Sequence, residues 1–319
     1  MRTLSADDIV RLAAHWPPLV DAADAALTAL ATGACAAPVR SSLPLIDGAL
    51  LTMPGRLHGA PTAIVKLVSV TPRNGARGLP TIQGIAVVFD AETGAPVATL
   101  DGAALTAVRT GAVSAAAARR LADPSARTLA LLGSGRQAAW QARAISAVLP
   151  IERVAVWSPT PAARERLAAR LDRELPAAVS PVDSVSEATR DAAVVCCATT
   201  ARAAFLRADM LASRRVFVAA IGAFQPDMAE LDVSVFRRAR RVYVDDDAAV
   251  RHEGGDVIQA LRAGALASEG ILPVGAVSGG AGPARDQDRD QEITVFKSVG
   301  SAVEDTAVAA ALLGAIDQP

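Results

Sequence analysis

The chain has 319 residues, enough for about two domains and a substantial hydrophobic core. Hydrophobic residues make up 51% of it and aromatic residues only 3%, a composition that suits helices packed closely on sheets. A formal net charge of −1 gives no electrostatic reason to expect nucleic acid or a membrane surface as a partner. There is no signal-peptide segment and no apolar run of membrane-spanning length, so we expect a cytoplasmic protein.

The cysteines and histidines do not follow metal-binding patterns. The three cysteines are Cys35 and the neighbouring pair Cys196 and Cys197, and no Cys-x-x-Cys spacing is present. The three histidines are scattered without a His-x-x-x-His spacing. We therefore expect buried free thiols in a reducing compartment and no metal site.

The first third of the chain predicts two helices followed by a sheet. Ser5 and Asp8 have the spacing of a capping box for a first helix, and Gly33 stops a second helix near residue 31. Consecutive extended segments without helices between them predict an antiparallel sheet, with strands at 38–44, 49–53, 62–70, 82–90 and 95–100. A helical segment then runs to Leu121 and ends at Asp123-Pro124. We place the domain junction there.

After this junction strands and helices alternate, which predicts a Rossmann-type, doubly wound parallel sheet of the α/β class. The expected strands are 128–132, 153–157, a weak one at 179–182, 192–198, 216–221 and 241–244. Residues 278–291 read as an exposed loop, and a final helix is expected over 295–316. The predicted domains are therefore 1–122 plus 293–319, an α+β substrate and dimerisation domain, and 123–292, the dinucleotide-binding domain.

A glycine-rich turn follows the first strand of the alternating region. Gly133, Gly135 and Ala138 give a Gly-x-Gly-x-x-Ala pattern that opens a helix reaching about residue 149. The first glycine allows a tight turn and the second lets the backbone approach a pyrophosphate, while the free amides of the helix start meet its charge. The pattern predicts a dinucleotide site that includes Gly133, Ser134, Gly135, Arg136 and Gln137.

The end of the second parallel strand bears on the choice of cofactor. NAD-specific sheets place an acidic residue there for the ribose 2′-hydroxyl, whereas this strand ends in Ser158-Pro159-Thr160. Hydroxyl groups at Ser158 and Thr160 can donate to a 2′-phosphate, so NADP(H) is favoured and NAD(H) stays open. Arg164 lies near this point but reads as a solvent-facing helix residue.

Several stretches together resemble the ornithine cyclodeaminase/mu-crystallin family. The most specific is the Leu-Asp-Gly, Leu-Thr-Ala and Arg-Thr-Gly run over 99–111. The matching stretches are 38–40, 64–66, 99–111, 133–141, 219–223 with Pro226 and 230–232, 255–257 and 294–305, so the resemblance covers nearly the whole chain. It implies a Rossmann domain beside an N-terminal α+β domain that the C-terminal helix completes, with homodimerisation through the N-terminal sheet.

The resemblance also implies site residues. The family's basic residues that hold the substrate carboxylate correspond to Arg40, Lys66 and Arg109, and charge-assisted donors suit that task. Met53, Thr81 and Phe224 are assigned to the substrate pocket. The cofactor residues implied beyond the glycine turn are Thr110, Gly111, Ala198, Thr199, Ile221, Ser298, Val299 and Gly300.

One departure from the family pattern concerns the reaction. Ornithine cyclodeaminases carry an aspartate where this chain has Phe224, and a phenyl ring cannot accept a proton. Asp227 lies past a proline and is not expected to substitute. The segment looks like that of the ketimine reductases, which reduce Δ1-pyrroline-2-carboxylate and Δ1-piperideine-2-carboxylate to L-proline and L-pipecolate with NAD(P)H. The imine proton comes from bulk water or through Lys66, and both routes stay open.

Three other functions compete with this hypothesis. An ornithine cyclodeaminase-like lyase would release ammonia with catalytic NAD, and Phe224 argues against it. A non-catalytic crystallin-type binding protein would keep the nucleotide turn without turnover. An amino-acid dehydrogenase would act on a linear 2-oxo acid such as pyruvate together with ammonia or methylamine. The small-molecule partner expected here is a cyclic imino acid.

Overall fold

The computed structural model describes residues 1–212, 215–239, 241–277 and 293–316. They form two compact units, 1–112 with 301–319 and 113–300. These limits differ from the predicted domains at both junctions, because helix α3 (Gly102–Leu121) runs through the first junction and residues 293–297 form a strand of the second unit. The predicted loop 278–291 lies outside the described residues.

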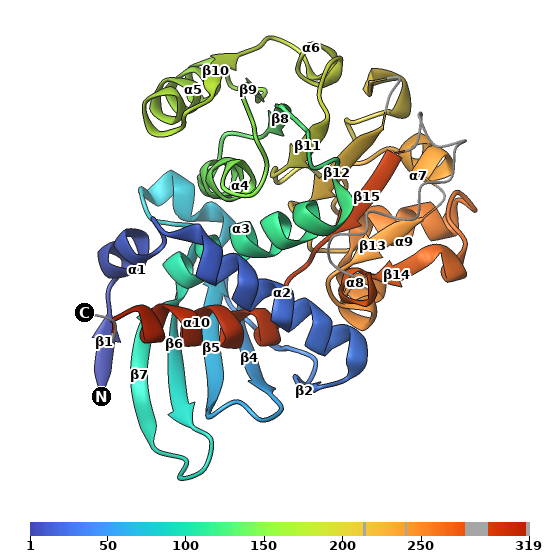
Figure 1. The fold of residues 1–319 in the computed structure, drawn as a ribbon. Helices are drawn as coiled ribbons and strands as arrows, with labels where there is room; N and C mark the ends of the chain where they lie inside the picture. The colour runs from blue at the N-terminus through green and yellow to red at the C-terminus, as the bar shows by residue number, and fades with distance from the viewer. Residues whose placement is uncertain (213–214, 240, 278–292, 317–319) are drawn as a thin grey trace. The chain divides into compact units, whose positions relative to one another are not determined.

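The first unit is a mostly antiparallel sheet with helices on one face (Figure 1). Its elements are β1 (Arg2–Leu4), α1 (Ala6–Leu12), α2 (Trp16–Thr32), β2 (Cys35–Ala36), β3 (Ser41–Pro44), β4 (Ala49–Leu57), β5 (Thr62–Val70), β6 (Ile82–Asp90), β7 (Pro96–Asp101) and α10 (Ala302–Ile316). The strand order is β1-β7-β6-β5-β4-β2, with β3 also paired to β4. The short strands β1 and β2 were not predicted, and β1 pairs parallel with β7.

Alternation along the strands decides which face of this sheet is covered. In β5, Ile64, Lys66 and Val68 are buried, whereas the residues between them are partly exposed. Helix α10 packs against α2, β4 and β5 on the buried face (Figure 1). Gly55 of β4 permits this approach, since a Cβ there would lie 2.7 Å from the backbone of Ala302. The predicted capping box at Ser5 and the stop at Gly33, whose φ is 70°, are both confirmed.

The second unit is the predicted parallel sheet with helices between its strands. Its strands are β8 (Thr128–Leu132), β9 (Arg153–Trp157), β10 (Ala178–Pro181), β11 (Val194–Cys197), β12 (Val216–Ala220), β13 (Val242–Val244), β14 (Ile271–Pro273) and β15 (Ile293–Lys297). Its helices are α4 (Arg136–Ser146), α5 (Pro161–Glu174), α6 (Val185–Thr189), α7 (Val233–Ala239), α8 (Asp247–Glu253) and α9 (Gly255–Arg262). The order β10-β9-β8-β11-β12-β15-β13-β14 confirms the Rossmann-type fold class.

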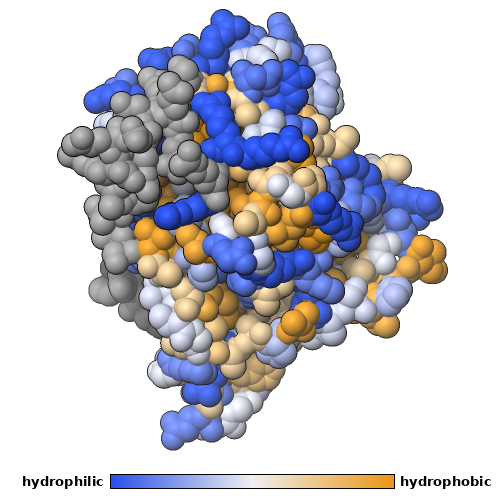
Figure 2. Space-filling view, turned by 90° about the vertical axis from the view of Figure 1, so that its right-hand side faces the viewer, coloured by the Kyte–Doolittle hydropathy of each residue, from blue (hydrophilic) through white to orange (hydrophobic). Residues whose placement is uncertain are grey.

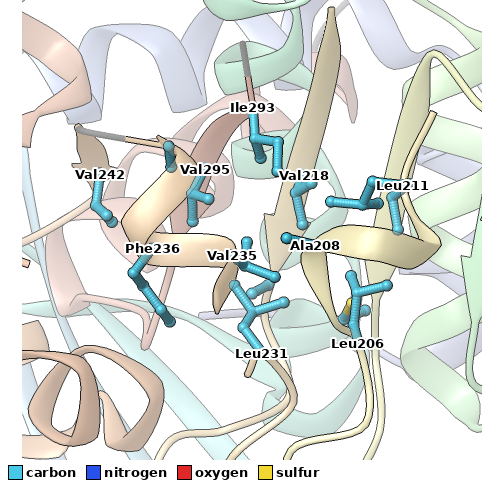
Figure 3. Packing of buried hydrophobic residues seen from close by; sticks show 14 of the residues in the cluster. Leu206, Ala208, Leu211, Val218, Leu231, Val235, Phe236, Val242, Ile293 and Val295 are labelled. Carbon is cyan, nitrogen blue, oxygen red and sulfur yellow. The ribbon is translucent and has the colours of Figure 1, made fainter. Parts of the chain in front are cut away.

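Buried apolar side chains fill both faces of the parallel sheet. Cys197 belongs to a cluster that includes residues of α6 and α7, whereas its neighbour Cys196 contacts Gln141 of α4. Figure 3 shows part of that cluster, with Val218 of β12 and Val295 of β15 packing near Val235 of α7. Neighbouring residues of one strand thus face different helices, as a doubly wound sheet requires.

The prediction of one continuous helix over 295–316 was wrong. Residues Ile293–Lys297 form the central strand β15, all five of them buried, and the helix begins only at Ala302. A strand covered on both faces has no alternating polarity, so a short apolar run of this kind looks the same as part of a buried helix.

The burial of the cysteines agrees in part with the prediction from the sequence. Cys196 and Cys197 are buried free thiols as predicted, whereas Cys35 is only half-buried. Figure 2 shows one face, on which hydrophobic residues reach the surface in separate groups among hydrophilic ones. Within the described ranges, every helix is too short or too polar to span a membrane.

Candidate functional site

A buried cluster of charged side chains lies in the first unit, on the face of the sheet that helix α10 covers. Lys66 of β5 is 1% exposed and forms an ion pair with Asp305 of α10. The Arg109 side chain, from α3, donates to Glu304 Oε2 over 2.9 Å, and its Nε lies 3.3 Å from Asp305 Oδ1. Two of the three predicted carboxylate-binding cations are therefore brought together, and both are already paired with acidic residues of the C-terminal helix.

Local structure explains why these side chains meet. The β-strand alternation places Lys66 on the same face as Met53, its partner in β4, under helix α10. Glu304 and Asp305 lie in the first turn of α10, where acidic side chains interact favourably with the helix dipole. Glu304 also accepts a hydrogen bond of 3.2 Å from the Ser301 amide just before the helix. The acidic pair is thus fixed from the helix side.

Burial changes the proton affinity of Lys66. Desolvation is the largest effect and lowers the pKa of Lys66 from 10.5 to about 8, with Arg109 and Arg40 acting in the same direction. Asp305 opposes them and raises this pKa. Lys66 is therefore protonated at neutral pH and releases its proton in mildly alkaline solution, which suits a proton donor.

The other predicted site residues of the first unit differ in how deeply they are buried. Met53 is buried beside Lys66, and Arg40, in the segment before β3, is partly exposed and close enough to act electrostatically on Lys66. Thr81 is exposed, so burial does not support its assignment to a pocket. Thr110 is buried in α3, and its hydroxyl donates to the Thr106 carbonyl over 2.7 Å.

The glycine turn of the second unit has the geometry that a dinucleotide requires. Gly133 has a φ of 128°, and a Cβ there would clash with the Ala198 carbonyl. Gly135 precedes α4 without a side-chain cap, and the space beside its Cα is open. The amides at the start of this helix, over Arg136 and Gln137, are therefore presented next to an open position suited to a pyrophosphate.

The residues at the end of β9 are fixed by hydrogen bonds among nearby side chains and backbone groups. Ser158 Oγ lies 2.9 Å from Ser134 Oγ and accepts from the Thr160 amide over 3.3 Å. Arg164 is 9% exposed, which corrects the solvent-facing prediction. Its guanidinium donates to the Ser158 carbonyl over 3.3 Å and pairs with Asp183, so α5 holds this arginine against the strand end.

The segment after β15 is fixed by one carboxylate. Asp245 Oδ2 accepts hydrogen bonds from Ser298 Oγ at 2.6 Å, the Val299 amide at 3.0 Å and the Gly300 amide at 2.8 Å. Asp245 is 1% exposed and follows β13, the neighbour of β15. The predicted nicotinamide segment is thus held in one conformation by a residue that the sequence did not single out.

Phe224 follows β12 and is half-buried in the second unit. Ala198, Thr199 and Ile221, the other predicted cofactor residues near the strand ends, follow β11 and β12. Asp227 is exposed and pairs with Arg202.

Glu304 and Asp305 are the functional candidates that sequence reasoning missed. The signal was two adjacent acidic residues in an otherwise apolar helical stretch, but their basic partners lie far away in sequence. No group of three or more histidine, cysteine, aspartate or glutamate side chains in the described segments is arranged to hold a metal ion.

The fold and the glycine turn define the class: a two-unit protein with a Rossmann-type dinucleotide-binding sheet. The chain belongs to the ornithine cyclodeaminase/mu-crystallin family, whose model matches residues 4–316. This confirms the family predicted from the sequence.

Known proteins similar to this chain come from bacteria and archaea. A Δ1-pyrroline-2-carboxylate/Δ1-piperideine-2-carboxylate reductase of Azospirillum brasilense is 36% identical over 294 residues, 92% of this chain and 89% of that protein. The structure of Thermococcus litoralis Δ1-pyrroline-2-carboxylate reductase with NADH and L-proline has a TM-score of 0.91 at 29% identity, covering 99% of this chain and 97% of that one. An archaeal alanine dehydrogenase dimer with bound NAD has a TM-score of 0.88 at 29% identity, covering 99% and 95%.

Proposed function

We propose that this protein is an NAD(P)H-dependent reductase of cyclic ketimines that carry one carboxylate. Its substrates are Δ1-pyrroline-2-carboxylate, Δ1-piperideine-2-carboxylate or both, and its products are L-proline and L-pipecolate. The observation that carries the proposal is the buried pair of cations, Lys66 and Arg109, in a family member whose relatives include reductases of these imines. Phe224 favours reduction over cyclodeamination, because it removes the carboxylate at the position that handles the substrate amine in the lyases.

The glycine turn suits the cofactor. Its open side at Gly135 and the uncapped start of α4 leave room and donors for a pyrophosphate. When bound, the reduced nicotinamide supplies the hydride that adds to the imine carbon.

The charged cluster of the first unit binds and protonates the substrate. Arg109 and Arg40 orient the carboxylate through charge-assisted hydrogen bonds. Lys66 holds a proton for the imine nitrogen, because the iminium form is the better hydride acceptor, and the lowered pKa of about 8 makes that proton available. Asp305 keeps Lys66 charged and in place.

The cofactor preference is a finer part of the proposal. No acidic residue ends β9, and the guanidinium of Arg164 lies at the Ser158 carbonyl, where a 2′-phosphate offers an alternative partner to Asp183. We therefore expect NADPH to bind more tightly than NADH. Replacing Ser158 by Asp should reverse the ratio of the two dissociation constants, and Ser158→Ala serves as the control without a charge.

A steady-state assay tests the reaction. Each imine is supplied with NADPH or NADH, and nicotinamide oxidation is followed by absorbance. Parallel reactions contain L-ornithine with NAD, and pyruvate with ammonia or methylamine. Oxidation with neither imine, together with ammonia release from ornithine, would overturn the proposal in favour of the lyase. Binding of the cofactor without turnover of any substrate would favour a crystallin-type binding protein.

A second candidate function is amino-acid dehydrogenation of a linear substrate. An archaeal alanine dehydrogenase is similar over nearly the whole chain, and Phe224 argues against the lyase, so this alternative ranks ahead of cyclodeamination. It predicts that pyruvate and ammonia sustain nicotinamide oxidation at least as well as the two imines do.

We also propose a homodimer that forms through the face of the first sheet opposite α10. Register places Leu43, Leu50, Leu67 and Ile85 on this face, and Leu43 and Ile85 are 61% and 44% exposed. An apolar face of this kind suits a second copy of the chain. Light scattering should give twice the monomer mass for the wild type, and Ile85→Glu should lower it. Ile316→Glu, at an equally exposed position of α10, is the matched control.

The cytoplasmic location stays a prediction.

A further inference from the structure

The ends of β11 and β12 are joined by one buried side chain that the proposed chemistry does not use. The two strands are parallel neighbours, so Thr199 and Gly222, which follow them, lie at the same edge of the sheet. Glu230 Oε1 accepts hydrogen bonds from the Thr199 amide at 2.7 Å and from the Thr199 hydroxyl at 2.8 Å. Its other oxygen, Oε2, accepts from the Gly222 amide at 2.7 Å. Glu230 is 0% exposed.

The bridge made by Glu230 reaches the glycine turn. Gly133 packs so closely on the Ala198 carbonyl that any Cβ at Gly133 would clash with it. Gly222 in turn has no space for a Cβ, because the Thr199 carbonyl and Glu230 Oε1 occupy that position. A displacement of Thr199 would therefore be transmitted to the turn that is proposed to hold the pyrophosphate.

Glu230 is itself anchored through its backbone. Asp256 Oδ1 accepts from the amides of Glu230 and Leu231 at 2.6 Å and 2.9 Å, and Asp256 Oδ2 accepts from Lys297 Nζ at 2.8 Å. Lys297 ends β15, directly before the Ser298–Gly300 segment that Asp245 holds. The ends of three central strands are thus tied to a single hydrogen-bonded network.

An ionised carboxylate is energetically unfavourable at this buried position. Burial raises the pKa of Glu230 from 4.5 to about 7, which means that its ionised form is destabilised by desolvation. Only a carboxylate, however, offers acceptor oxygens on both sides: a glutamine would present an amide N–H₂ to one of the two backbone donors. Two acceptors facing two strand ends are what a rigid bridge between those ends requires.

We propose that Glu230 is a positioning residue that sets the conformation of the 198–199 and 221–222 segments for nicotinamide-cofactor binding, an inference that rests on the proposed function. The Thr199 hydroxyl donates to Glu230 and accepts from the Ala201 amide at 3.2 Å, so it belongs to the bridge. The 198–199 segment meets the cofactor through its backbone instead. Glu230 acts on cofactor affinity, with little effect on the affinity for the imine.

The test measures cofactor binding apart from turnover. The dissociation constants of NADH and NADPH are obtained by fluorescence titration for the wild type, Glu230→Ala, Glu230→Gln and Thr199→Val, alongside melting temperatures and the KM values for cofactor and imine. Thr189→Val is the matched control, because Thr189 is a fully buried threonine of the same unit whose hydroxyl donates to the Val185 carbonyl. It removes a hydrogen-bonded threonine hydroxyl outside the bridge, at a position that is more buried than the half-buried Thr199.

We expect Glu230→Ala to weaken binding of both nucleotides by about tenfold or more, the equivalent of about 1.4 kcal/mol, with the imine KM little changed. Glu230→Gln should be intermediate, because it retains the acceptor for Thr199 and loses the one for Gly222. Thr189→Val should lower the melting temperature without weakening nucleotide binding.

Wild-type nucleotide affinity in Glu230→Gln and Thr199→Val would overturn the inference, even if Glu230→Ala fails to fold. The inference would also be overturned if Thr189→Val weakened nucleotide binding as much as the Glu230 variants do at the same drop in melting temperature, because the loss of affinity would then follow general destabilisation. A wild-type protein that binds neither nucleotide, or binds them without reducing an imine, would instead count against the proposed function.

Discussion

Each unit of this protein buries a lysine–aspartate pair, but the two pairs have different surroundings. In the second unit Lys297 pairs with Asp256, whose other oxygen accepts two backbone amides. In the first unit Lys66 pairs with Asp305, whose second partner is another side-chain cation, Arg109. A pair locked by backbone amides stabilises one fixed structure. A pair made by side chains is free of such backbone anchors, and under the proposed function it redistributes its contacts when the substrate carboxylate binds. The same residue types are therefore expected to be structural in the second unit and to bind substrate in the first.

The largest expected effect, and the sharpest test of this difference between the two pairs, comes from removing Lys66. Lys66→Met should lower kcat/KM for the imine by about 10²–10⁴-fold, the usual contribution of a general acid, while nucleotide affinity is retained. Lys66→Arg keeps the charge opposite Asp305 and controls for loss of the ion pair. A methionine variant with wild-type kcat/KM would show that the proton comes from bulk water.

Removing Lys297 should affect the fold instead. Lys297→Met leaves Asp256 buried without its cation, so the free energy of unfolding should fall by about 3–5 kcal/mol, measured by urea denaturation. Adding Asp256→Asn should restore part of the loss, because the neutral amide still accepts at Oδ1. An unchanged free energy of unfolding in Lys297→Met would contradict a structural role.

Truncating Arg109 should separate substrate binding from nucleotide binding. Arg109→Ala should raise the imine KM by an amount equivalent to about 1.5–3 kcal/mol, the range for a hydrogen bond to a charged group. The dissociation constant of NADPH should change little. Arg109→Lys, which keeps the charge but not the planar fork, should be intermediate. An unchanged KM would refute the carboxylate role.

The pH dependence of turnover reports on Lys66. Its pKa is lowered to about 8 in the ligand-free protein, and only the protonated form can donate, so kcat/KM should decline as pH rises through about 8. Asp305 raises this pKa, so Asp305→Asn should move the decline to lower pH. Glu304→Gln, which alters the partner of Arg109 instead, is the control. The same midpoint in Asp305→Asn and wild type would contradict the coupling.

The smallest expected effect is a pH dependence of stability in the second unit. Because the pKa of Glu230 is raised from 4.5 to about 7, the folded chain binds more protons than the unfolded chain between these values. The contribution of Glu230 to the free energy of unfolding is therefore greatest below pH 4.5 and decreases as pH rises through about 7. Subtracting the melting-temperature profile of Glu230→Gln from that of the wild type isolates this contribution, and a flat difference would contradict it.

Local patterns in the sequence predicted much of the fold. Consecutive extended segments without helices between them predicted the antiparallel strands at 62–70 and 82–90, and the capping box at Ser5 and the stop at Gly33 lie where expected. These features depend on neighbours within a few residues, which a single sequence displays directly. The strand β15 was missed because a central parallel strand carries no local period.

The candidate site was predictable only in part. Lys66 and Arg109 were found through the family resemblance, and the structure brings them together in one buried cluster. Arg164 was expected to face solvent, but the loop after β10 supplies Asp183 beside it and the strand end supplies a carbonyl acceptor. A helical position alone does not reveal such tertiary partners.

The sequence by itself determined the family, the glycine turn at 133–135 and the identity of the basic residues, because each is a pattern of residue types along the chain. Only the tertiary structure decided that Glu304 and Asp305 face these cations and that Glu230 joins two strand ends. Those contacts connect residues far apart in sequence, and burial determines their strength, so their energies arise only once the chain has folded.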